Sequence, residues 1–130
     1  MRTADGARLA LAGVRTLNGA LALFAPHVLA RRMGALPPGR GPALYPLRMF
    51  GVRTVLLGAE LAVLSGESRR RALQSGVLIH ATDTLSAGIA GLRREVPPRF
   101  AAVATAISAT NTALAAVALA GEAGDKSKQG

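Results

Sequence analysis

The stretch Arg48-Met-Phe-Gly-Val-Arg53-Thr-Val-Leu-Leu-Gly58-Ala-Glu60 decides how this chain folds. It is an apolar run of helical character that contains two opposite charges, Arg53 and Glu60, seven residues apart. Seven residues make two helical turns, so the two side chains share one face of a helix. Because burying a lone ion is costly, an apolar helix with internal charges needs partners from other segments.

The other apolar segments contain candidate partners. Each of these has polar residues inside an apolar run: Arg15, Asn18, His80, Asp83 and Asn111. We therefore predict an all-α fold, a four-helix transmembrane bundle with up-down-up-down topology. Its interior is predicted to hold a polar cleft lined by these five residues together with Arg53 and Glu60.

Helix-breaking residues and apolar length set the expected boundaries. Helices are predicted at about residues 7–32, 46–64, 69–93 and 98–120, in one membrane domain of residues 1–120, with 121–130 as a disordered polar tail. Pro26 should bend the first helix or end it early, and Pro46 and Pro98 suit first helical turns. Residues 100–120 contain no charge, and a membrane span needs about 20 such residues.

Composition favours a membrane protein. Half of the residues are hydrophobic, cysteine is absent, and the net charge of +9 sits in basic clusters between the apolar segments. Such clusters are typical of membrane flanks, whereas a nucleic-acid surface would carry them along one face or among aromatics. We therefore predict a multi-pass protein of the cell membrane, with the lipid bilayer as partner and no nucleic acid. A soluble, Ala-rich bundle is the alternative.

The balance of Lys and Arg sets no orientation. In the four-span arrangement the two sides of the membrane receive seven basic residues each. Orientation normally follows a Lys/Arg bias, so the tie also permits insertion both ways and an antiparallel homodimer.

Depth along the helices predicts which charges pair. Glu60 should lie at the depth of Arg15, and Asp83 at a depth close to that of Arg53. We predict the interhelical pairs Arg15–Glu60 and Arg53–Asp83, with His80 one turn from Asp83 and able to join it. Asn18 and Asn111 are expected to form hydrogen bonds near the middle of the bundle.

Recognisable catalytic motifs are absent from the sequence, including a phosphate loop and a nucleophile elbow. His80, Asp83 and Glu60 would be a thin ligand set for a metal ion, so we expect neither a metal nor a cofactor. His80 and Asp83 are the candidates for acid/base catalysis if the chain is an enzyme.

Three functions follow from these residues. The leading hypothesis is that the cleft binds a small molecule or a membrane-protein partner. The alternatives are a small membrane enzyme that uses His80 and Asp83, and an efflux transporter that works as an antiparallel dimer.

The run Arg48-Met-Phe50-Gly51-Val-Arg53, followed by Gly58 and a third helix with Asp83, resembles a known group. It is similar to small four-helix membrane proteins of actinobacteria, of unknown function, which carry an Arg-x-Phe-Gly-x-Arg signature and a downstream Asp. Thr54 stands where many of these proteins have an acidic residue. The resemblance implies the four-helix architecture and no particular activity.

Overall fold

The computed structural model describes residues 2–34 and 44–127, and this part of the chain is all-helical. Its elements in order are α1 (Arg2–Phe24), α2 (Pro26–Arg32), α3 (Leu44–Val63), α4 (Gly66–Leu92) and α5 (Pro98–Ser127). The all-α class is confirmed. Most of the loop expected after the first helix lies outside the described residues.

Proline residues set two helix boundaries as predicted. The first apolar segment breaks after Phe24, and Pro26 opens α2, whose axis is bent by 103° from that of α1. Pro98 is the first residue of α5, where its missing N–H leaves no hydrogen bond unmade.

The last helix is longer than expected. The region from residue 121 was predicted as a disordered tail, yet α5 continues to Ser127. Two contacts hold the extra turns: Gly121 packs against Ala4 of α1, and Glu122 forms an ion pair with Arg69 of α4. These contacts join residues far apart in the sequence, so composition alone did not reveal them.

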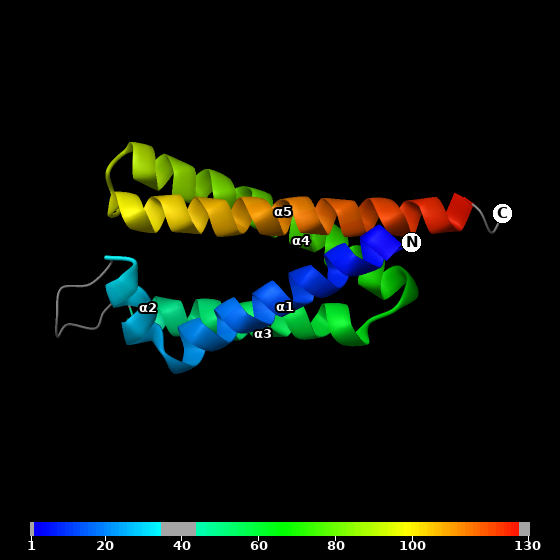
Figure 1. Cartoon of the computed structure of the whole chain (residues 1–130), viewed down its shortest axis with the longest axis horizontal. Coiled ribbons are helices and arrows are strands. Elements are labelled where there is room, and N and C mark those ends of the chain that lie inside the picture. The colour runs from blue at the N-terminus through cyan, green and yellow to red at the C-terminus, as the bar shows by residue number, and fades with distance from the viewer. Residues whose placement is uncertain (1, 35–43, 128–130) are drawn as a thin grey trace.

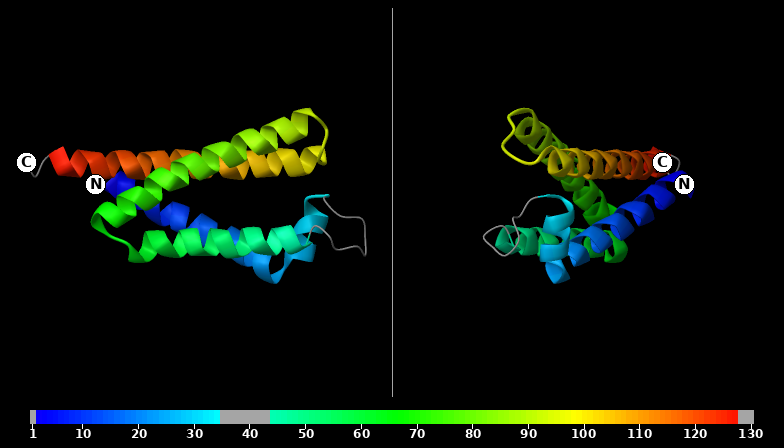
Figure 2. Two further views of the ribbon diagram at one scale, coloured as in Figure 1. Left: turned by 180° about the vertical axis from the view of Figure 1, so that it is seen from behind. Right: turned by 60° about the vertical axis from the view of Figure 1, so that its left-hand side comes forward.

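The four long helices form two antiparallel hairpins, α1 with α3 and α4 with α5 (Figure 1). The hairpins meet where the N-terminus of α1 lies beside the end of α5, and they diverge toward the end that carries α2 (Figures 1 and 2). We call these the closed end and the open end. Between the hairpins α1 packs extensively on α5, whereas α3 touches α4 much less.

A small apolar core fills the closed end. It contains the fully buried Leu11 of α1, Leu61 of α3 and Leu73 of α4, with Ala115 and Ala118 of α5 packed among them. Alanine and leucine pack helices closely without aromatic bulk. The core therefore fixes the two hairpins at this end and leaves the other end free to separate.

Within the first hairpin two glycines allow the helices to touch. A methyl group added at Gly19 would lie 2.8 Å from the Gly51 carbonyl oxygen, and one added at Gly51 would lie 2.7 Å from the Gly19 carbonyl oxygen. The backbones of α1 and α3 thus meet at a crossing that admits no side chain on either helix. Close approach through small residues is typical of helices packed in membranes.

One helix in the described part of the chain is long and apolar enough to cross a membrane by itself. This helix is α5, over Pro98–Gly124, and only 17% of its most apolar window is buried in the structure. The segment Thr3–Phe24 passes the same test only together with Pro26–Arg32, as a bent pair.

Candidate functional site

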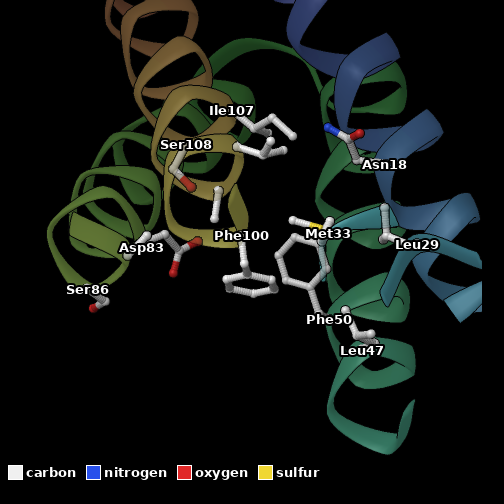
Figure 3. A pocket seen from close by; sticks show the side chains of 13 residues that line it. Asn18, Leu29, Met33, Leu47, Phe50, Asp83, Ser86, Phe100, Ile107 and Ser108 are labelled. Carbon is white, nitrogen blue, oxygen red and sulfur yellow. The ribbon is translucent and has the colours of Figure 1, made fainter. Parts of the chain in front are cut away.

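A cavity of about 230 Å³ lies between the two hairpins near the open end (Figure 3). Its walls are mostly apolar and come from every helix: Asn18, Leu29, Met33, Leu47, Phe50, Asp83, Ser86, Ala87, Phe100, Val103, Ala104, Ile107 and Ser108. Phe50 of α3 and Phe100 of α5 project toward each other from opposite hairpins (Figure 3). We call this cavity the cleft. Asp83 is the one charged residue among the described residues of its wall.

Asp83 forms the predicted ion pair with Arg53. The Arg53 Nη2 atom lies 3.2 Å from the Asp83 Oδ2 atom, and the side chains keep 50% and 31% of their surface exposed. The Arg53 guanidinium also lies over the Phe50 ring, 5.8 Å from its centroid. One cation is therefore held by a carboxylate and an aromatic face together, a combination that organic cations also favour.

The Arg15 side chain is buried in the interior and does not form an ion pair with Glu60. The side chain is 1% exposed, its Nε donates a hydrogen bond to His80 Nε2 at 2.9 Å, and its Nη1 donates to the Leu57 carbonyl oxygen at 3.1 Å. Gly76 of α4 makes room for it, because a methyl group there would lie 2.5 Å from Arg15 Nη2. The predicted Arg15–Glu60 pair is thus wrong for the described residues: Glu60 is exposed and acts on Arg15 only electrostatically.

His80 connects this buried arginine to the cleft. Its Nε2 accepts the Arg15 hydrogen bond, so that nitrogen carries no proton and the neutral ring carries its proton on Nδ1. Nδ1 faces Asp83, with 4.0 Å between Nδ1 and Oδ2. The Arg15–His80 hydrogen bond joins α1 to α4, the Asp83–Arg53 ion pair joins α4 to α3, and the two pairs lie next to each other without a hydrogen bond between them.

The two predicted asparagines occupy different places. Asn18 of α1 lines the cleft, whereas Asn111 of α5 is 4% exposed and its Oδ1 has no hydrogen-bond partner in the described structure. Of the seven residues predicted for a polar cleft, Asn18 and Asp83 form walls of the cavity. Arg15 and His80 do not line it, and Arg53 lies beside it, against the wall residues Asp83 and Phe50.

Sequence reasoning missed the apolar majority of the cleft. Phe50 and Phe100 were visible only as aromatics near helix ends, and Leu29 and Met33 gave no signal. They come together because the bend at Pro26 turns α2 out of the line of α1, while the hairpins diverge at this end. Periodicity along single helices contains no information on either feature.

A second cavity, of about 200 Å³, lies at the closed end. Among the residues whose side chains the structure describes, the charged ones that line it are two acidic and two basic residues: Asp5, Arg8, Arg69 and Glu122. The Arg69 Nε atom lies 2.5 Å from Glu122 Oε1, and Arg8 Nη1 donates to the Leu61 carbonyl oxygen at 2.8 Å. These contacts tie helix ends together, which favours a structural role for this end.

Within the described residues, no group of three or more His, Cys, Asp or Glu side chains is placed to hold a metal ion. Comparison of the chain with models of protein families, with curated proteins and with solved structures finds no match. The cleft, with Asp83 in its wall and Arg53 beside it, is therefore the candidate functional site.

Proposed function

We propose that the chain is an integral membrane protein whose helices α1, α3, α4 and α5 cross the bilayer, and that its cleft binds a small, largely apolar molecule. These helices contain 23, 20, 27 and 30 residues, and a span needs about 20. Length alone therefore allows all four to cross.

The distribution of side chains supports the membrane part of this proposal. Large apolar residues are exposed on all four long helices, including Leu17, Leu56, Leu78, Ile89 and Val117. Arg15, Thr54, His80 and Asn111 are buried inside. Large apolar side chains exposed on every long helix suit a lipid environment, and polar side chains buried between helices are typical of membrane bundles.

Arg15 of α1, Arg53 of α3 and Asp83 of α4 are compatible with this placement because each has a partner. Arg53 pairs with Asp83, and Arg15 donates to His80 and to a backbone carbonyl group. Ionisable groups inside membranes face the bundle interior and pair in this way.

The single observation that carries the ligand proposal is the cleft itself, an apolar cavity of about 230 Å³ with a few polar groups in its wall. Ligand sites are typically concave and apolar, with a small number of polar groups that orient the bound molecule. The enzyme alternative gains no support from the geometry, because His80 does not line the cleft and its Nε2 is occupied by Arg15.

The membrane part is tested by cysteine labelling, since the chain has no native cysteine. Leu17→Cys and Leu78→Cys place a thiol at exposed mid-helix positions, and Glu95→Cys places one between α4 and α5. In permeabilised cells a charged maleimide should label Glu95→Cys and spare the other two until detergent is added. Equal labelling of all three before detergent would contradict the proposal.

The ligand part is tested with neopentylbenzene, a small neutral hydrocarbon, and purified protein in detergent. A ligand that binds the folded state raises the melting temperature. We expect neopentylbenzene to do so for the wild type and for Ala109→Phe, which adds bulk at an exposed position of α5. Ala104→Phe fills the cleft and should abolish the shift. The same shift in all three proteins would show that the hydrocarbon binds elsewhere.

A further inference from the structure

Resting on the proposed function, we infer that the cleft selects small lipophilic organic monocations, which bind to Asp83 and the Phe50 ring in place of Arg53. The Arg53 side chain shows how such a cation would bind. The Arg53 guanidinium already contacts the Asp83 carboxylate and lies over the Phe50 ring.

The polar groups in the cleft wall suit a cation. Asp83 contributes an acceptor with negative charge, and Ser108 contributes a hydroxyl group. None of the described wall residues carries a positive charge, and the neighbouring Arg53 is paired with Asp83. A carboxylate combined with an aromatic face recognises ammonium groups.

Arg53 can give up its place at small cost. Half of its side-chain surface is exposed, and a long arginine side chain in a membrane helix can extend its guanidinium toward the headgroups, which limits the cost of leaving Asp83. Asp83 is less exposed than Arg53, and its neighbour His80 is fixed by Arg15. An incoming cation would therefore meet a carboxylate that stays in position and a guanidinium that can turn away.

The depth of Asp83 and the apolar wall around it require the cation to be lipophilic. Asp83 stands nine residues before Leu92, about 14 Å from the end of α4 at the helical rise of 1.5 Å per residue. At that depth in a bilayer a hydrated ion is costly. A cation with an apolar body can instead pack against Leu47, Phe100 and Val103 in the cleft wall.

The experiment compares two probes of the same shape. Benzyltrimethylammonium carries a positive nitrogen where neopentylbenzene has a neutral carbon. Affinities are measured from the dependence of melting temperature on probe concentration, for the wild type and three variants: Arg53→Gln, Asp83→Asn and Glu60→Gln.

The two proteins without an intact ion pair should respond in opposite directions. Arg53→Gln removes the internal competitor and should bind the cation up to about fivefold more tightly than the wild type, with unchanged affinity for the hydrocarbon. Asp83→Asn should lose the preference for the cation and keep the hydrocarbon. Glu60→Gln removes a carboxylate outside the cleft and should behave as the wild type.

The outcomes separate the two proposals. Hydrocarbon binding without a tighter cation complex in Arg53→Gln would overturn cation selectivity and leave the proposed function standing. Binding of neither probe by any of the proteins would overturn both. A gain of affinity in Arg53→Gln cannot result from misfolding, so the test does not depend on the fold of Asp83→Asn.

Discussion

Arg53 and Asp83 form an ion pair, with 3.2 Å between Nη2 and Oδ2, across the seam where α3 and α4 barely pack. Arg15 and His80 bridge the same hairpins from α1 to α4. Apolar packing holds the closed end, and these polar links continue it toward the cleft. A few side chains therefore connect the hairpins near the open end, and each of them can be mutated separately.

The fit between Arg15 and Gly76 is testable by a double-mutant cycle. Gly76→Ala should destabilise the protein by about 1–3 kcal/mol, because the guanidinium is fixed by His80 and Leu57 and cannot move aside. In the Arg15→Met background the same change should be neutral or stabilising. Unfolding in detergent measures all four proteins, and equal effects of Gly76→Ala in both backgrounds would contradict the predicted coupling.

The crossing of α1 and α3 predicts that only certain glycines are essential. Gly19→Ala and Gly51→Ala should each cost about 1–3 kcal/mol, because the added methyl group meets the backbone of the other helix. Gly13→Ala and Gly88→Ala are matched controls with no neighbour within 4 Å, and they should gain up to about 1 kcal/mol from helix propensity. Thermal unfolding of the four variants distinguishes packing from a general intolerance of alanine.

The turn between the hairpins depends on the backbone of Gly66. Its φ of +55° is a left-handed conformation, and a methyl group there would meet nothing within 4 Å. Gly66→Ala should therefore cost about 1–2 kcal/mol for conformational reasons alone. Gly6→Ala, also without close neighbours, is the control in an ordinary helical conformation. If the two changes have the same effect on the free energy of unfolding, the turn does not need glycine.

The ion pair at the closed end should matter more than one on the surface. Glu122→Gln breaks the contact with Arg69, whose side chain is only 25% exposed, and should cost about 1.5 kcal/mol. Glu95→Gln breaks the open pair with Arg93, in which the atoms are 3.8 Å apart, and should change stability by less than about 0.5 kcal/mol. Raising the salt concentration should leave the Glu122→Gln effect largely intact, since burial limits screening.

The sequence predicted correctly those features that depend on local residues or on the position of a residue along its helix. Pro26 breaks its helix wherever the helix packs, and Arg53 finds Asp83 because the two lie at similar depth on neighbouring helices. Prediction failed where the contacts depend on how a helix is rotated about its own axis, because that rotation determines which residues face the neighbouring helices. The buried face of α3 contains Gly51, Thr54, Gly58 and Leu61, and Glu60 lies off that face, away from Arg15.

The character of the cleft was mispredicted for a related reason. A polar residue inside an apolar helix must avoid lipid, but it can turn either to a cavity or to the seam between helices. Arg15 and His80 turn to the seam, where Arg15 Nε donates a hydrogen bond to His80 Nε2. The cavity is left to apolar side chains from the diverging helix ends, whose contacts only the tertiary arrangement creates.

The cleft lies near the open end, and the apolar core of Leu11, Leu61 and Leu73 separates it from the closed end. If the cleft binds a ligand in a bilayer, as proposed, the ligand would enter from one side, so each copy would exchange with one compartment. The two ends have equal numbers of basic residues in the sequence, so nothing in the charge balance favours one direction of insertion. A population inserted both ways would sample both compartments, and two opposed copies would together give access to each.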